Sequence, residues 1–237
     1  MSGQPTLSLH HLPTREQNLF YILVLIASPI INLLVSSLVY TDFRMISLKG
    51  HHEFGLFNWF FACSSFLLGG VLILLGLNLA HTLLARHQRH ARKSLLAFGL
   101  VSSLYLLINL LTISYGILEF KVQSLFLLLV SICVYISLNI IFLFWYWYVD
   151  YPSQIRRLHH PESIPEICFP MSAHSQQSWV PNVLDYLYFT VLTSNTLGPP
   201  ENHSPAGQKA KLVVFLHSVV MLIVLVIFVS RAINTLT

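Results

Sequence analysis

The fold is decided by a stretch that reads DYLYFTVLTSNTLGPP at positions 185–200. Beyond Asp185 this stretch is uncharged, yet as a helix Tyr186–Pro200 extends only about 22 Å, too short for a hydrocarbon core of about 30 Å. Two successive prolines end any helix there. Asn182 and Asp185 are spaced as a helix cap and its capping-box partner. The stretch therefore either lies on the membrane surface or, as we expect, dips in as a half-membrane helix and returns.

Five longer uncharged runs surround this stretch. Each is long enough to cross a bilayer as a helix, because about 20 residues at 1.5 Å each cover the hydrocarbon core. Backbone groups cannot stay unpaired in lipid, so each run should be helical. The runs are Asn18–Tyr40, Gly55–Ala85, Ser94–Leu118, Val122–Val149 and Leu212–Ser230. The sequence predicts an all-α integral membrane protein with five transmembrane helices and a re-entrant pore half-helix before the last span.

The composition supports this class. Of 237 residues, 13 are Lys or Arg and 9 are Asp or Glu, so 9% are charged, whereas a soluble domain carries about 25%. Hydrophobic residues make up 55% of the chain. So few charges cannot cover the surface of a soluble fold that is so rich in apolar side chains. The composition also excludes disordered chains, disulfide scaffolds and nucleic-acid-binding domains.

The polar turn after the half-helix carries the candidate functional residues. The C-terminus of a helix has a partial negative charge, which favours a cation in front of it. Hydroxyl, amide and backbone carbonyl oxygens can replace part of an ion's hydration shell. We expect the ion path to be lined by Thr193, Ser194, Asn195, Thr196, Leu197 and Gly198, with Glu201 as a charge at the mouth. His217, an ionisable residue inside the last span, is a candidate on the pore-lining helix.

Residues 185–198 resemble the pore helix and filter entry of potassium-channel-like pore-loop proteins, in which an aromatic-rich helix leads to T-x-T-T-V-G-Y-G-D. On that pattern TLGPPE at 196–201 stands in place of TVGYGD, so prolines replace the Tyr-Gly step. The chain is also loosely similar, over most of its length, to an uncharacterised bacterial family of multi-spanning membrane proteins. That family has a D-x-L-Y-F helix and a last span that begins L-x-x-L-H, here VVFLH at 213–217.

The resemblance implies a cation channel with a non-standard selectivity loop. The fourth span would be the outer pore helix, the last span would line the pore, and a homo-tetramer would surround it. Residues 1–17 would then be an N-terminal tail, 18–119 an accessory three-helix membrane region and 120–237 the pore-like region. The expected partners are the lipid bilayer and monovalent cations, with no nucleic acid and no cofactor.

The distribution of basic residues predicts the orientation. The connector Arg86–Lys93 is the densest basic cluster, and with five spans one side of the membrane receives nine Lys and Arg residues while the other receives four. Positively charged connectors stay in the cytoplasm. We expect a multi-pass protein of the plasma or inner membrane with a cytoplasmic N-terminus. The half-helix would enter from the cytoplasmic side.

Three other functions remain open. A non-conducting scaffold or assembly subunit would leave no chemical signature. A secondary transporter usually carries an acidic residue inside a span, and the carboxylates here, including Asp150, are expected near span ends. The 12 His residues form no HxxxH, HxxHH or HExxH box, so a histidine-metal membrane enzyme ranks lower still and no metal or catalytic residue is assigned.

Overall fold

The computed structural model describes residues 26–35, 37, 55–84, 88–119, 124–170 and 179–236, and it is mostly helical. The predicted tail, residues 1–17, lies outside the described residues. In chain order the elements are α2 (Gly55–Leu84), α3 (Gln88–Glu119), α4 (Ser124–His159), β1 (Ile167–Cys168), α6 (Val183–Thr196), β2 (Ser204–Pro205) and α7 (Gln208–Leu236).

Three helical segments are long and apolar enough to cross a bilayer. They are Arg92–Tyr115 in α3, Phe126–His159 in α4 and Gln208–Ile233 in α7. Each overlaps one of the predicted spans, which confirms the helical membrane class. Two shorter apolar helices, Ile26–Val35 and Ala62–Leu77, lie within the predicted first and second spans.

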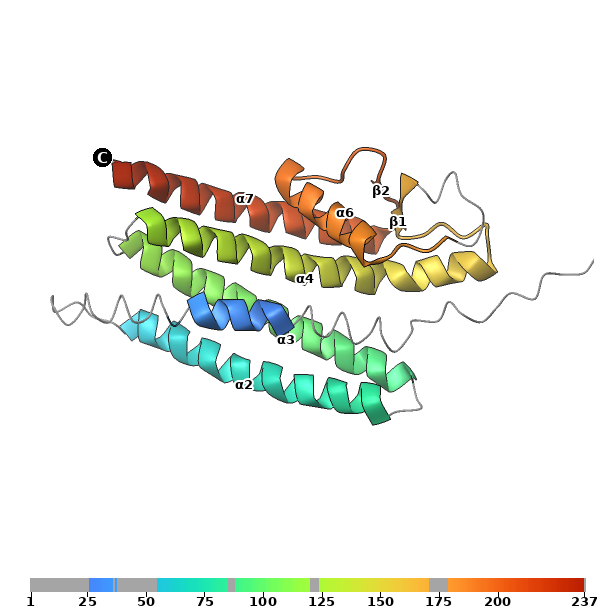
Figure 1. The fold of residues 1–237 in the computed structure, drawn as a ribbon, viewed down its shortest axis with the longest axis horizontal. Helices are drawn as coiled ribbons and strands as arrows, with labels where there is room; N and C mark the ends of the chain where they lie inside the picture. The colour runs from blue at the N-terminus through green and yellow to red at the C-terminus, as the bar shows by residue number, and fades with distance from the viewer. Residues whose placement is uncertain are drawn as a thin grey trace, which may run out of the picture.

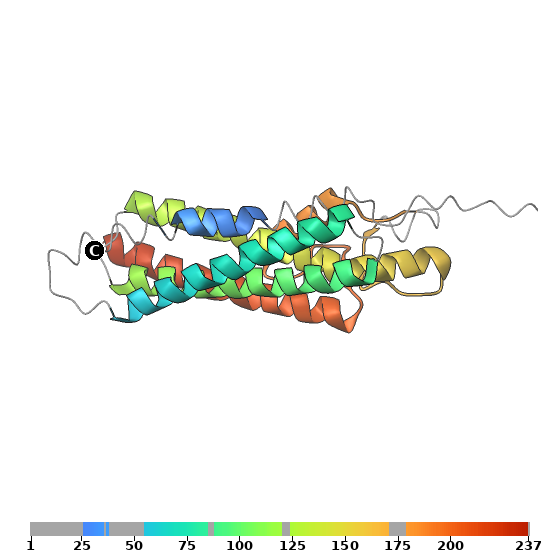
Figure 2. The same cartoon turned by 90° about the horizontal axis from the view of Figure 1, so that it is seen from below.

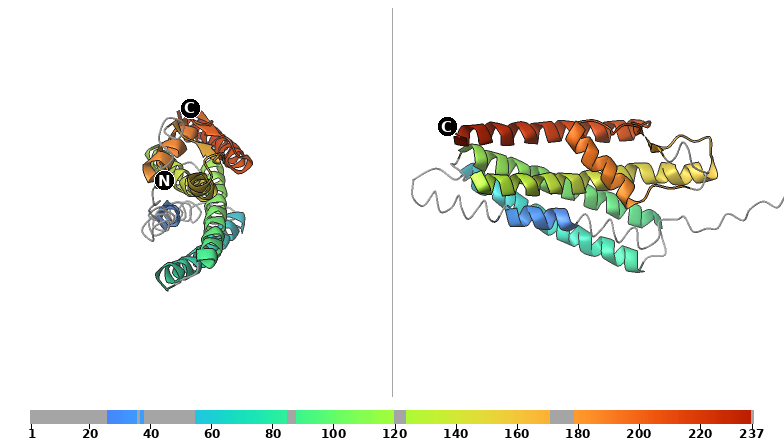
Figure 3. Two further views of the ribbon diagram at one scale, coloured as in Figure 1. Left: turned by 90° about the vertical axis from the view of Figure 1, so that its right-hand side faces the viewer. Right: turned by 45° about the horizontal axis from the view of Figure 1, so that its top comes forward.

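The long helices lie side by side in an elongated bundle (Figure 1). α2 packs on α3, α3 packs on α4, and α4 also contacts α6 and α7. Figure 2 shows the same bundle from below, with α2 crossing α3 at a shallow angle. The short helix α6 lies obliquely between α4 and α7 (Figure 3). Two side-chain hydrogen bonds join these layers: Ser64 Oγ donates to Asn109 Oδ1 at 2.7 Å, and Trp145 Nε1 donates to Ser103 Oγ at 2.9 Å.

Aromatic rings fill the centre of the bundle. The largest fully buried side chains include Tyr105, Tyr146, Tyr186, Phe98, Phe144 and Phe189. The ring of Tyr146 meets that of Phe189 edge to face, with centroids 4.8 Å apart, one of the arrangements that aromatic pairs prefer. A side chain at Gly99 would collide with the ring of Phe144. This glycine therefore lets α3 approach α4 closely.

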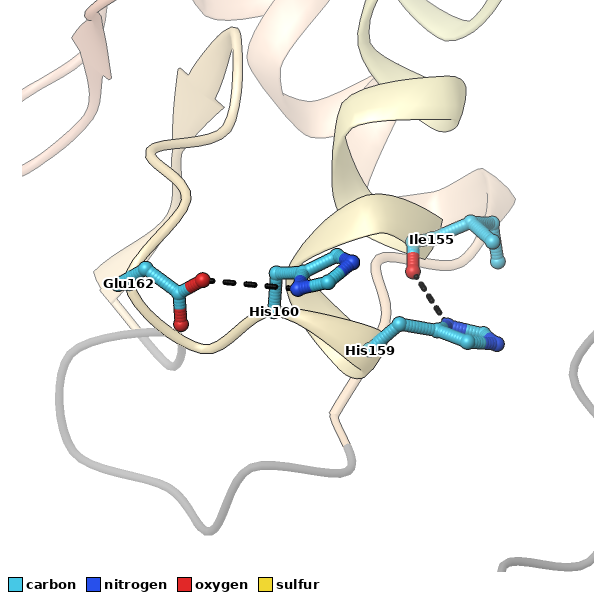
Figure 4. Close-up of polar contacts among 4 residues, drawn as sticks. All are labelled: Ile155, His159, His160 and Glu162. Carbon is cyan, nitrogen blue, oxygen red and sulfur yellow. Dashed lines mark hydrogen bonds and ion pairs between the residues drawn. The ribbon is translucent and has the colours of Figure 1, made fainter.

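The end of α4 differs from the predicted span. The apolar run ends at Val149, but the helix continues through Pro152 to His159. The added turns are held by local bonds: Ser153 Oγ donates to Asp150 O at 2.6 Å, and His159 Nδ1 lies 3.1 Å from Ile155 O (Figure 4). Arg156 and Arg157 accordingly stand on a helical extension and not in an irregular connector.

A short antiparallel ribbon closes the same end of the bundle. β1 pairs with β2 so that Ile167 faces Pro205 and Cys168 faces Ser204. The expectation of an all-helical chain misses this ribbon, because two-residue strands carry no periodic pattern. The ribbon ties the segment after α4 to the segment before α7.

Candidate functional site

The start of α6 is fixed by a reciprocal cap, as the sequence predicts. Asn182 Oδ1 accepts from the backbone N–H groups of Leu184 at 2.8 Å and Asp185 at 3.2 Å. Asp185 Oδ2 accepts from the N–H of Asn182 at 2.7 Å. This capping box satisfies N–H groups that have no partner inside the helix.

Asp150 anchors the first turn of α6 to α4. Its Oδ2 accepts from the Tyr186 hydroxyl at 2.7 Å and from Gln154 Nε2 at 2.9 Å. Its Oδ1 accepts from the Ile167 N–H at 2.8 Å and lies 3.1 Å from Ser153 Oγ, whose proton points to the Asp150 carbonyl. The side chain is fully buried, so these three donors replace water that a carboxylate would otherwise bind.

The burial of Asp150 corrects the expectation that the acidic residues only flank the spans. Asp150 belongs to the apolar segment Phe126–His159 and has no contact with solvent. Its partners come from β1 and α6 as well as from α4. The sequence shows only a carboxylate after an aromatic run. The residues next to Asp150 in the sequence do not reveal the distant hydrogen-bond donors that compensate for burying its carboxylate.

The last turn of α6 is joined to α7 through His217. Ser194 Oγ lies 2.8 Å from His217 Nε2, and the Tyr146 hydroxyl lies 3.0 Å from His217 Nδ1. The imidazole ring stacks on Phe142 with a centroid separation of 4.0 Å. His217 has no exposed surface. The residue predicted for the pore-lining helix is therefore a buried junction between α4, α6 and α7 in the protomer.

The donors and acceptors around His217 form one consistent chain. Ser194 has a single hydroxyl proton, which Asn139 Oδ1 accepts at 2.8 Å. His217 Nε2 then donates to Ser194 Oγ, and Nδ1 accepts from the Tyr146 hydroxyl. Asn139 Nδ2 donates onward to the Tyr135 carbonyl at 2.9 Å. A neutral imidazole with both nitrogens bonded thus satisfies every group in the chain.

The other residues predicted for the ion path divide into buried and exposed sets. Thr193 is buried like Ser194, and its hydroxyl donates to the Phe189 carbonyl at 2.7 Å. The exposed set lies at the helix end: Asn195, Thr196 and Leu197 are exposed and Gly198 is half-buried. Glu201 is exposed in the loop that follows.

The exposed turn has a defined geometry. Asn195 Oδ1 accepts from the Tyr135 hydroxyl at 2.9 Å, and Thr196 Oγ1 lies 2.8 Å from both the Leu192 and Gly198 carbonyls. Leu197 closes the helix with φ 54°, in the left-handed region. Glycine usually takes that position, but here Gly198, one residue later, has no positive φ.

The chain then returns to the end of the bundle where α6 began. The His203 N–H donates to the Pro200 carbonyl at 3.0 Å, and the imidazole of His203 packs against Phe169 and Phe189. The Glu166 carbonyl accepts from the N–H groups of Ala206 and Gly207. Glu166 Oε2 accepts from the N–H of Ala210 at 3.2 Å and so caps the first turn of α7. Sequence reasoning did not identify Glu166.

These contacts fix the level of the polar turn. α6 starts beside Asp150, and its last turn lies beside Asn139, about 16 Å back along α4 at helical rise. On α7 the turn contacts His217, about 14 Å from the beginning of that helix. The turn therefore lies inside the length of the bundle, while both ends of the 183–207 segment lie at one end of it.

Within the described residues, no group of three His, Cys, Asp or Glu side chains is arranged to hold a metal ion. Cys168, beside the ribbon, is a half-buried free thiol. Burial raises its pKa, and the nearby carboxylate of Asp150 raises it further.

Comparisons of the chain with family models, with curated proteins and with solved structures find no match.

Proposed function

We propose that the protein is a subunit of a multi-pass cation channel of the pore-loop type. In this proposal five helices span the membrane, α4 is the outer pore helix, α6 is a re-entrant half-helix and α7 lines the path. The membrane is the plasma or inner membrane, and the N-terminus is cytoplasmic. The permeant ions are monovalent cations.

One observation carries the proposal: the polar C-terminal turn of α6 is exposed and is held partway along the length of the bundle, while the chain enters and leaves at one end. Asp150 fixes the entry, and Ser194 with His217 fixes the depth. The return segment is fixed by Glu166 at the start of α7. Irregular backbone at membrane depth is tolerated only where protein buries it or where it borders a water-filled cavity. An exposed polar turn at this depth fits the second case.

We assign the two sets of polar residues different roles. Thr193 and Ser194 donate their hydroxyl protons to groups within the protomer, so they hold the turn in position and do not contact the ion. Asn195, Thr196 and the carbonyl groups of Leu197 and Gly198 would contact the ion. The partial negative charge at the end of α6 favours a cation there. Glu201 would add a negative charge at the mouth.

One protomer presents the turn on its surface and cannot surround an ion with it, so the proposal needs several copies, and the resemblance to pore-loop channels implies a homo-tetramer. Large apolar side chains remain exposed on both helices beside the turn. They include Leu184, Leu187 and Tyr188 on α6 and Leu212, Phe215 and Leu216 on α7. Other copies and lipid would cover this surface, which water cannot solvate favourably.

Single-channel recording of the reconstituted full-length protein tests the proposal. We expect unitary currents with potassium or sodium as the only cation, and an altered conductance in Thr196→Ala. Ser131→Ala is the matched control. The Ser131 hydroxyl lies 2.7 Å from the carbonyl of Leu127, four positions earlier, just as the Thr196 hydroxyl lies 2.8 Å from the carbonyl of Leu192. The control should conduct as the wild type does.

Three other results would indicate a function other than a cation channel. Saturable flux without current steps would indicate a transporter, and a stoichiometric bound metal would indicate a metal enzyme. A protein that never conducts and co-purifies with one stable partner would be a scaffold or assembly subunit. Any of these three results contradicts the channel.

A further inference from the structure

Exposed basic residues gather at the end of the bundle where α6 enters. Arg92 and Lys93 stand near the start of α3, Arg156 and Arg157 on the last turns of α4, and Lys209 and Lys211 on the first turn of α7. We call these six residues the basic rim. Five of them are exposed, and Arg157 is half-buried. Figures 1 and 2 show that these three helix ends lie at the same end of the molecule.

One contact places the rim beside an aromatic side chain, and a second joins it to the backbone before α6. Arg92 Cζ lies 5.1 Å from the ring centroid of Tyr148, a cation–π distance. Arg157 Nη2 donates to the Trp179 carbonyl at 2.6 Å. Tyr and Trp side chains concentrate at membrane interfaces, and Tyr148 is in direct contact with the rim and follows Trp145 and Trp147 on α4. The rim therefore lies at the height of lipid headgroups.

The carboxylates at this end are already used by other groups. Asp150 accepts hydrogen bonds from Tyr186, Gln154 and the Ile167 N–H, Asp185 belongs to the capping box and Glu166 caps α7. Glu162 pairs with His160 at 3.5 Å (Figure 4). Over the part of the chain that the structure describes, no basic rim residue lies within ion-pair distance of a carboxylate.

We propose that the basic rim binds the headgroups of anionic phospholipids in the leaflet that it faces. Clusters of four to eight Lys and Arg residues beside a membrane helix attract anionic lipids, each contributing roughly 1 kcal/mol. Asp150 is buried, and Asp185, Glu166 and Glu162 are bonded to groups outside the rim, so the positive charges of the rim have no carboxylate partner among the described residues. This binding does not depend on the proposed conductance.

The lysines at the start of α7 also indicate where a lipid headgroup would bind. Lys209 and Lys211 flank Ala210, whose side chain is buried and whose N–H is held by Glu166. The two lysines project to opposite flanks of this buried position, so a headgroup on either one would rest against the fixed first turn of α7. Arg156 would approach the same leaflet from α4.

Quenching of tryptophan fluorescence by brominated lipids tests the proposal. In a Trp59→Phe background of the full chain, the three remaining tryptophans, Trp145, Trp147 and Trp179, all lie on α4 or just before α6. The protein is reconstituted into vesicles of phosphatidylcholine and brominated phosphatidylglycerol. In a second set of vesicles the phosphatidylcholine carries the bromine atoms and the phosphatidylglycerol carries none. We expect phosphatidylglycerol to be preferred near these tryptophans, and this preference to weaken in about 1 M salt, where the Debye length is about 3 Å.

Substitutions locate the effect. In Arg156→Gln/Lys209→Gln/Lys211→Gln the preference should fall by roughly fivefold for each charge removed. Arg231→Gln, at the opposite end of α7, is the control and should keep the wild-type preference. Equal quenching by both lipids in the wild type would overturn the proposal. So would a preference that salt does not change, that the triple variant keeps, or that millimolar inorganic phosphate abolishes.

Discussion

Tyr186 donates its hydroxyl proton to Asp150 Oδ2 over 2.7 Å, and this bond joins the first turn of α6 to the last buried turns of α4. Tyr186→Phe removes this bond and changes little else. We expect a loss of about 1–3 kcal/mol in the free energy of unfolding, as for bonds to charged or buried groups. Unfolding in mixed SDS micelles measures it. Tyr188→Phe, on the exposed face of the same helix, should stay close to the wild type.

Asp150→Asn should be more destabilising than Tyr186→Phe. The substitution replaces one acceptor oxygen with an NH₂ group that faces donors from Tyr186, Gln154 and the ribbon. Buried donors that face one another are left without partners. The same unfolding assay measures the loss. Glu162→Gln, an exposed carboxylate near the end of α4, serves as the control. An Asp150→Asn protein as stable as this control would contradict the anchoring role of Asp150.

Ser194 and His217 should behave as one energetic unit. His217→Phe keeps a ring against Phe142 but leaves Ser194 and Tyr146 without their partner. A double-mutant cycle with Ser194→Ala should show a coupling of about 0.5–3 kcal/mol, as residues in one hydrogen-bond network do. The cycle of His217→Phe with the distant Ser131→Ala should be additive. Additive losses in both cycles would show that the junction is not cooperative.

Gly207 and Gly76 should respond in opposite ways to alanine. A methyl group at Gly207 would collide with the Glu166 carboxylate that caps α7, whereas the space around Gly76 in α2 is open. Gly207→Ala should lower the melting temperature. Gly76→Ala should be neutral or stabilising by up to about 1 kcal/mol, because alanine favours a helix. Thermal unfolding in detergent compares the two variants.

Cys168 should be alkylated slowly at neutral pH. Its raised pKa leaves a smaller fraction of thiolate than in a free cysteine, whose pKa is about 8.5. The rate should rise about tenfold per pH unit and keep rising above pH 8.5. Mass spectrometry of a Cys63→Ser/Cys133→Ser protein treated with iodoacetamide follows this reaction. A rate that levels off below pH 8.5 would show a lowered pKa.

Local patterns in the sequence predict much of this fold. Uncharged runs place α3, α4 and α7, because lipid forces long apolar segments to satisfy their backbone groups internally. The spacing of Asn182 and Asp185 predicts the start of α6, since a capping box needs only residues close in sequence. The end of α6 is also placed correctly by Gly198, Pro199 and Pro200.

The contacts that position the polar turn could not be predicted in this way. Asp150 and Tyr186 are 36 positions apart, and Ser194 and Asn139 are 55 apart. Such pairs form only when helices pack, and the sequence around each polar residue does not identify its partner. The left-handed conformation of Leu197 could not be predicted either, because leucine disfavours it.

Asp150 also has a consequence for the order of biosynthesis. Because translation proceeds from the N-terminus, α4 and its Asp150 carboxylate leave the ribosome well before Tyr186 is synthesised. Until α6 is made and docks, water at the end of α4 must solvate that charge. Docking of α6 therefore requires the dehydration of a single side chain, and α4 cannot settle to its final depth until then.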